Sequence, residues 1–117
     1  MSTITPLDEA LAELCEVQFA TSGYRKPVGY FRSCLAQQTN GELMLFVAHA
    51  PGRYLGHVKL VWLPDYPPFQ AGGIPEIQDL NVLPDYRRQG IGTALITVCE
   101  VLAATRTDTI GIGVGLH

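Results

Sequence analysis

Apolar residues near the N-terminus recur at helical spacing. Leucines repeat every three or four residues along Leu7–Leu14, which predicts an amphipathic helix. Thr5-Pro6 precedes this run, so we expect Thr5 as the N-cap and Pro6 at the first helical position. The turn residues Thr21-Ser22-Gly23 end the helix. A second short helix is expected over Pro27–Gln38, which has its own apolar face.

Strand-like patterns replace the helical period in the middle of the chain. Glu42–Ala48 and Tyr54–Trp62 are rich in β-forming residues and predict two strands. The segment Ala50-Pro51-Gly52-Arg53 between them is a Pro-Gly turn suited to an antiparallel hairpin. Leu63–Gly73 contains three prolines and a Gly-Gly pair, so we expect a long loop there.

The last part of the chain predicts a strand, a long helix and a final strand. Glu76–Val82 is the expected strand, ended by Leu83-Pro84-Asp85. Gln89–Thr105 carries apolar residues at helical spacing, and Ile110–Leu116 follows as a strand. The predicted order is α-α-β-β-β-α-β, in a single α/β (α+β) domain spanning residues 1–117 with no internal repeat.

Composition narrows the class of protein. Hydrophobic residues make up 47% of the 117 residues, enough for a sizeable core. Charged residues make up only 16%, against about 25% in an average protein. This favours an apolar surface covered by a partner chain, a ligand or a missing segment. We expect a homodimer, because the last predicted strand would expose unpaired backbone. The net charge of −3 argues against a nucleic-acid partner, which requires a basic face.

Cysteines and histidines form no metal or disulfide pattern. The three cysteines, Cys15, Cys34 and Cys99, are far apart and odd in number, so we expect reduced thiols and no metal site. His49 and His57 flank the Pro-Gly turn and are expected at the surface. The opening residues lack a leader pattern, and no apolar run approaches the ~18 residues of a membrane span. We therefore expect a cytoplasmic protein without a membrane partner.

The stretch from Leu80 to Leu95 carries the clearest chemical signal. A strand runs into a short basic turn, and the turn opens a long helix. Backbone N–H groups at a helix N-terminus lack intrahelical partners, and the helix dipole favours an anion there. Gly90 and Gly92 let an anion approach the backbone, while Arg87 and Arg88 add charge. The pattern predicts a phosphate or pyrophosphate cradle.

Three known kinds of phosphate cradle can be compared with this pattern. A P-loop is excluded because no Lys-Ser/Thr pair follows the glycines. A dinucleotide-binding fingerprint requires a third glycine where Leu95 stands. The pattern Arg87-x-x-Gly90-x-Gly92, after Leu80-x-Val82 and before a helix, resembles the acetyl-CoA motif (R/Q-x-x-G-x-G/A) of the GNAT superfamily of N-acetyltransferases. An ordinary strand-to-helix turn that uses glycine for tightness is the alternative.

The resemblance implies a fold, a co-substrate and a set of binding residues. The fold is a mixed, mostly antiparallel sheet flanked by helices, and acetyl-CoA is the co-substrate. Strand residues would pair with the pantetheine arm, one backbone N–H near them would polarise the thioester carbonyl, and the cradle would surround the pyrophosphate. The residues carried over are Leu80, Asn81, Val82, Arg87, Arg88, Gln89, Gly90, Ile91, Gly92 and Thr93.

Glu76 is the candidate general base. Attack on a thioester requires a neutral amine, so a carboxylate must remove a proton from an ammonium group. Glu76 lies six residues before Val82, where the histone-acetyltransferase branch of the superfamily carries its glutamate base. Alternation places it on one face with Gln78, Leu80 and Val82 unless a bulge resets the phase, with Asp79 opposite. A solvated carboxylate near a strand end is the alternative interpretation.

Glycines and aromatic residues suggest further parts of the site. Gly111, Gly113 and Gly115 leave one face of the last strand bare, either for the co-substrate or for packing of the preceding helix. Four aromatic residues in two connections are candidates for the acceptor site, because these connections border that site in the superfamily. They are Tyr24, Tyr30, Tyr66 and Phe69.

The resemblance also implies a departure. Complete members continue after the strand Ile110–Leu116 with a further helix and strands, which this sequence does not contain. That helix carries the tyrosine that protonates the leaving thiolate. The predicted function is transfer of an acetyl group from acetyl-CoA to a primary amine of a small molecule or peptide. The alternative is a non-catalytic acyl-CoA-binding or dimerising module.

Overall fold

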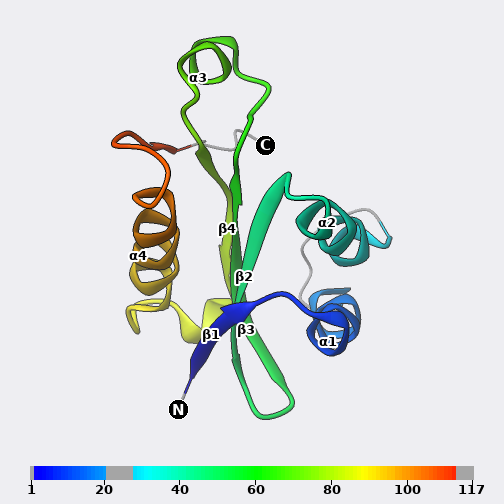
Figure 1. Cartoon of the computed structure of the whole chain (residues 1–117). Helices are drawn as coiled ribbons and strands as arrows, with labels where there is room; N and C mark the ends of the chain where they lie inside the picture. Colours follow the sequence, from blue (N-terminus) through cyan, green and yellow to red (C-terminus); the bar gives the residue numbers. More distant parts are fainter. Residues whose placement is uncertain (1, 21–27, 113–117) are drawn as a thin grey trace.

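A five-stranded sheet runs through the molecule, and helices cover both of its faces (Figure 1). The structure is a computed structural model that describes residues 2–20 and 28–112. The sheet order is β1-β2-β3-β4-β5, with antiparallel neighbours throughout except for the parallel pair β4–β5. The strands are β1 (Thr3–Pro6), β2 (Leu43–Ala50), β3 (Arg53–Val61), β4 (Glu76–Val82) and β5 (Gly111–Ile112).

The helices divide the hydrophobic core in two. Helices α1 (Glu9–Ala20) and α2 (Tyr30–Thr39) cover one face, and α4 (Ile91–Ala103) covers the other (Figure 1). Apolar residues of α1 and α2 pack with Leu43, Leu45 and Val47 of β2. Apolar residues of α4 pack on the opposite face of β2, β3 and β4. The predicted mixed, mostly antiparallel sheet flanked by helices is confirmed.

The N-terminus differs from the prediction of an immediate helix. Residues Thr3–Pro6 form an edge strand, where the missing N–H of Pro6 is tolerated. Helix α1 starts after Asp8, whose Oδ1 accepts a 2.8 Å hydrogen bond from the N–H of Leu11. Asp8 is therefore the N-cap in place of Thr5. The strand was missed because four residues are too few for a period-2 pattern.

The connection before β4 also differs from the prediction. The expected loop Leu63–Gly73 contains the helix α3 (Pro67–Gly72), which has proline at its first positions and Gly73 in the left-handed region behind it. Both features are ordinary helix-end chemistry. The predicted strand Glu76–Val82 is confirmed as β4, whereas the helix expected from Gln89 begins at Ile91.

Strand β5 comprises Gly111–Ile112. It pairs Gly111 with Glu76 and Ile112 with Ile77, in the parallel direction. The bare face of Gly111 is occupied by the ring of Phe69 from α3, which leaves no space for a Cβ. The sequence predicts that this bare face either leaves space for the co-substrate or packs against the preceding helix. The contact with Phe69 is neither of these. Gly113 and Gly115 lie outside the described residues. Within the described ranges, no helix is long and apolar enough to cross a membrane.

Candidate active site

A β-bulge interrupts β4 at its centre. Lys59 of β3 pairs with Gln78, and His57 pairs with Asn81, so Asp79 and its successor together oppose one residue of β3. Asp79 has a φ of 55°, in the left-handed region, which is uncommon for a residue other than glycine. An extra residue at this point shifts the alternation of the strand by one position.

The bulge changes which side chains share a face. Ile77 and Val82 both pack on the α4 side, although they are five residues apart. Glu76 is paired with Val61, whose side chain packs with the α1 and α2 core. The predicted common face of Glu76, Gln78 and Val82 is therefore wrong for Val82, because the bulge intervenes. Asp79 also lies on the α2 side, the same side as Glu76, although the alternation predicts it on the opposite face.

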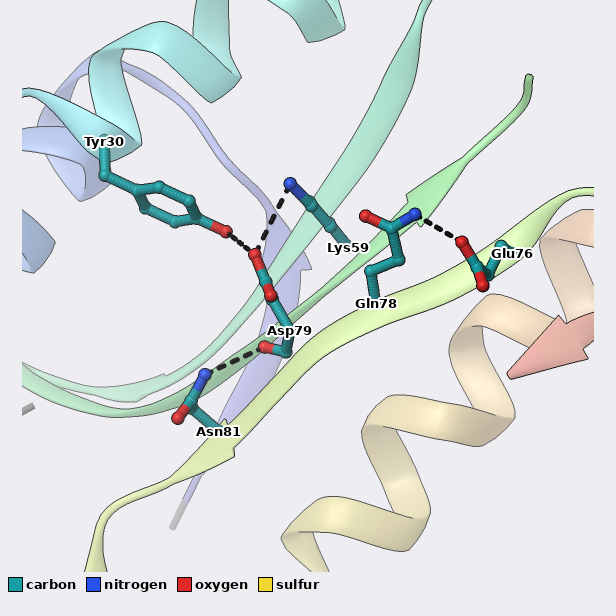
Figure 2. Close-up of polar contacts among 6 residues, drawn as sticks. All are labelled: Tyr30, Lys59, Glu76, Gln78, Asp79 and Asn81. Atoms are coloured by element: carbon teal, nitrogen blue, oxygen red, sulfur yellow. Dashed lines mark hydrogen bonds and ion pairs between the residues drawn. The ribbon is translucent and has the colours of Figure 1, made fainter. Parts of the chain in front are cut away.

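Three side chains fix Asp79 from three elements (Figure 2). The Tyr30 hydroxyl at the start of α2 donates a 2.5 Å hydrogen bond to the Asp79 carboxylate. Lys59 Nζ lies 3.4 Å from the same carboxylate oxygen. The Asn81 side-chain amide donates to the Asp79 carbonyl oxygen at 3.0 Å. The bulge is thus held through both the side chain and the backbone of one residue.

Glu76 lies at the start of β4 and is half-buried. The side-chain amide of Gln78 donates a hydrogen bond to its carboxylate, and both side chains lie on the same side of β4 (Figure 2). This contact orients the carboxylate and leaves it other lone-pair positions, because an ionised carboxylate has about four. The arrangement suits a group that accepts a proton.

The turn after β4 presents backbone N–H groups at the start of α4. Gly90 is the N-cap with φ 79°, and no side chain caps the helix. The N–H groups of the first helical turn therefore lack intrahelical partners. Arg88 also adopts the left-handed region, with φ 66°. Arg87 Nε donates to the carbonyl oxygen of Val82 at 3.1 Å, which ties the basic turn to the end of β4.

A cavity of about 370 Å³ lies at this turn. Eight of the ten residues predicted for co-substrate binding line this cavity, together with Tyr86. Ile91 is buried in the core beneath α4, and the Gln89 side chain donates to the Asp85 carbonyl oxygen at 3.4 Å. The lining residues are Leu80, Asn81, Val82, Tyr86, Arg87, Arg88, Gly90, Gly92 and Thr93.

Of the predicted acceptor residues that the structure describes, Tyr66 and Phe69 contact each other and Tyr30 contacts Asp79. Tyr24 lies outside the described residues. Tyr30 contacts Asp79 as described, whereas Tyr66 and Phe69 form an edge-to-face pair in and before α3, with ring centroids 4.8 Å apart. Phe69 covers Gly111 at the same time.

A larger cavity, of about 460 Å³, is lined by residues of α2, β2, β3 and β4, including Gln78, the hydrogen-bond partner of Glu76. Its lining includes Lys59 and Gln78, and carboxylates from Glu42 and Asp65 stand at its edge. None of the four predicted aromatic residues is in this lining as far as the described chain goes. The remaining lining residues are Gln37, Gly41, Leu43, Val61, Trp62, Leu63 and Pro64.

Two predictions about isolated residues have opposite outcomes. Cys99 is buried in the α4 core, as expected, and burial raises its pKa to about 12, so the thiol is neutral. His57 is fully buried, and its Nδ1 lies 2.6 Å from the Tyr54 hydroxyl, so the expected surface position is wrong. Strand β3 carries it beneath the aromatic rings of α1 and α2. Among the described residues, no group of three metal-ligating side chains occurs.

Lys59 and the close packing at Gly56 were not anticipated from the sequence. A Cβ on Gly56 would lie 2.5 Å from the Asn81 carbonyl oxygen, so β3 needs glycine where it passes the end of β4. The bulge had a visible signal, because adjacent polar residues Gln78 and Asp79 break the alternation of Glu76–Val82. Lys59 had no such signal, since its role depends on strand pairing.

Comparison with known protein families identifies one family for this chain. The sequence matches the acetyltransferase (GNAT) family over residues 8–114. No curated protein sequence matches the chain.

Three solved structures illustrate the similarity in fold. An aminoglycoside antibiotic 6'-N-acetyltransferase from Acinetobacter baumannii has a TM-score of 0.78 and 16% identity, covering 99% of this chain and 81% of that one. A ribosomal-protein-alanine N-acetyltransferase from Brucella melitensis has a TM-score of 0.72 and 22% identity, covering 97% and 80%. A predicted acetyltransferase with acetyl-CoA from Clostridium acetobutylicum has a TM-score of 0.68 and 16% identity, covering 99% and 81%.

Proposed function

The chain belongs to the acetyltransferase (GNAT) family, and on that premise we propose that it transfers an acetyl group from acetyl-CoA to a primary amine. The observation that carries this proposal is the junction of β4 and α4. A bulged strand, a basic turn and an uncapped helix N-terminus border one cavity of about 370 Å³.

The residues around this cavity suit a molecule with an anionic end and an uncharged arm. Arg88 and the N–H groups after Gly90 offer charge and hydrogen bonds to a pyrophosphate. Leu80 and Val82 offer apolar contact and main-chain groups to a pantetheine arm. Acetyl-CoA, when bound, supplies an acetyl group activated as a thioester. The main-chain N–H groups near Leu80–Val82 are the proposed donors to its carbonyl oxygen.

Glu76 is the proposed general base. Its carboxylate accepts a hydrogen bond from Gln78, which lines the larger cavity, and it is the proposed acceptor of a proton from an incoming ammonium group. Asp79 is the other carboxylate of β4, but Tyr30 and Lys59 occupy it. That contrast supports Glu76 as the proton acceptor and Asp79 as a structural partner.

The larger cavity, next to Gln78, is the proposed approach for the acceptor amine. Glu42 and Asp65 at its edge give it a local negative charge that favours a cationic substrate. The similar proteins from Acinetobacter and Brucella are described as acting on an aminoglycoside antibiotic and on a ribosomal-protein alanine. A small polyamine and a peptide N-terminus both fit this chemistry, so a panel of amines is the suitable probe. Tyr24, Tyr30, Tyr66 and Phe69 remain proposed neighbours of the acceptor.

Titration calorimetry with acetyl-CoA, followed by thioester cleavage over a panel of amines, tests the proposal. Glu76→Gln should lower kcat by about 10²–10⁴-fold, the usual contribution of a general base, and leave acetyl-CoA affinity unchanged. Glu100→Gln, an exposed carboxylate on α4, is the matched control. Absence of acetyl-CoA binding would overturn the proposal. Binding without turnover for every amine would favour a non-catalytic acyl-CoA-binding module.

We also propose that the protein works as a homodimer in the cytoplasm. Ile112 of β5 is 59% exposed at the end of the sheet order, which supports pairing of two copies at that edge. Cys15 and Cys99 are buried thiols outside any disulfide, which supports a reducing compartment. Sedimentation tests the first part, and a monodisperse monomer would contradict it.

A further inference from the structure

Asp79 joins three elements at the bulge of β4. Tyr30 comes from α2, Lys59 from β3 and Asn81 from β4 itself (Figure 2). Lys59 Nζ also lies 5.5 Å from the centroid of the Tyr30 ring, so the two partners of Asp79 contact each other. The catalytic mechanism proposed above uses none of these contacts.

The contacts stabilise a backbone conformation that is otherwise unfavourable. A non-glycine residue in the left-handed region persists only when its surroundings hold it there. Asp79 meets that condition because its carboxylate accepts a hydrogen bond from Tyr30 and forms an ion pair with Lys59. The side chains of Lys59 and Asp79 are mostly buried. Burial and the hydrogen bond to Asp79 raise the pKa of Tyr30, so the hydroxyl stays a proton donor.

The held residue immediately precedes the strand segment that borders the smaller cavity. Leu80, Asn81 and Val82 all line that cavity. Their main-chain direction depends on the bulge, because a one-residue shift in pairing would turn every following side chain to the other face. A change at Tyr30 therefore reaches the cavity through the backbone of Asp79.

We propose that Tyr30 and Lys59 are positioning residues that act through Asp79 to hold the Leu80–Val82 main chain in register for the acetyl thioester. Neither side chain touches the reacting atoms in this proposal. The catalytic part of the inference rests on the proposed acetyltransferase function. The anchoring part concerns the free protein and can be measured without a co-substrate.

Four variants test the inference. Tyr30→Phe removes the hydroxyl, and Asp79→Ala removes the carboxylate that it meets. Asp79→Asn should rescue the part of the loss that depends on Tyr30, because asparagine tolerates the left-handed region and still accepts the hydrogen bond, but not the part that depends on the ion pair with Lys59. Thr39→Val is the matched control, since it removes a hydroxyl that bonds to Leu35 within the same helix α2.

The expected result has two parts. Tyr30→Phe should lower kcat about tenfold, the effect of losing one hydrogen bond to a charged group, while the Kd for free CoA stays within about twofold. Hydrogen exchange of the Leu80–Val82 amides should rise in Tyr30→Phe and most in Asp79→Ala, rise less in Asp79→Asn than in Asp79→Ala, and stay unchanged in Thr39→Val. A loss caused only by unfolding would lower the melting temperature without separating kcat from CoA affinity.

Other outcomes overturn specific statements. Unchanged exchange in both Tyr30→Phe and Asp79→Ala would refute the anchoring, whatever the activity. Faster exchange with unchanged kcat in an active protein would refute the positioning role and leave the acetyltransferase proposal intact. A wild-type chain that does not bind acetyl-CoA would refute the proposed function and the positioning role, while the exchange data would still decide the anchoring.

Discussion

Replacing Gly90 with alanine should weaken both the fold and the co-substrate site. Gly90 has φ 79°, and no atom lies within 4 Å of the place where a Cβ would stand. The methyl group therefore meets no obstacle, and the whole penalty comes from the backbone conformation. That penalty is about 1–2 kcal/mol for an L-residue in the left-handed region. Relaxation out of this region would move the N–H groups that follow it.

Gly92 provides a matched control two positions further along the chain. It lies inside α4, and a Cβ there would lie 3.8 Å from Val82 Cγ2, an ordinary contact. Alanine is a better helix former than glycine, so Gly92→Ala should stabilise the free protein by about 0.5–1 kcal/mol. Glycine-to-alanine substitution is thus expected to lower the free energy of unfolding at Gly90 and to raise it at Gly92.

Urea denaturation and titration calorimetry with CoA measure the two quantities. Gly90→Ala should lower the free energy of unfolding by about 1 kcal/mol, or roughly 4 °C in melting temperature, and weaken CoA binding about tenfold. Gly92→Ala should raise the melting temperature, so it is a control for stability alone, because Gly92 also lines the cavity proposed for CoA. If Gly90→Ala bound CoA normally, the N–H groups behind Gly90 would not be the anion site, and the cradle argument would be refuted.

Three further predictions concern packing, thiols and capping. Gly111→Ala should cost about 1–3 kcal/mol in urea denaturation, because its Cβ overlaps the Phe69 ring; adding Phe69→Ala should recover part of that loss, and simple additivity would contradict the contact. Burial raises the pKa of Cys15 and of Cys99 to about 12, so both thiols of the native protein should resist alkylation at pH 8, and rapid labelling would disprove this. The stability that the neutral thiols contribute should be present below pH 9 and lost as the pH rises towards 12. Asp8→Ala should destabilise the protein by about 1 kcal/mol and Asp8→Asn much less, since only the former removes the cap of α1; equal unfolding midpoints would disprove the cap.

The parts of the fold that the sequence predicted well are those with long periodic patterns. Helix α4 and strand β4 were placed within two residues, because thirteen and seven residues give the pattern enough repeats. Strand β1 was missed because its four residues have no pattern of their own and form a strand only by pairing with β2. Helix α3 was missed for a similar reason, since its prolines predict a loop as well as a helix start.

The candidate site shows the same division. The cradle was predictable because its glycines, arginines and helix are contiguous in sequence. The contact between Tyr30 and Asp79 joins residues 49 positions apart, and Lys59 reaches them from a third element. Such contacts depend on which strands pair and in which register. No local pattern contains that information.

The bulge in β4 has a consequence for how the strand is encoded. If Asp79 is left out, the rest of the segment spells Glu-Ile-Gln-Leu-Asn-Val, in which polar and apolar residues alternate without a break. Gln78 and Asn81 would keep their partners Lys59 and His57, with one residue between them on each strand. Asp79 is thus a single-residue insertion in an otherwise regular strand. We expect a chain lacking Asp79 to retain the alternating pattern for the sheet and to lose the proposed anchor of the Leu80–Val82 main chain.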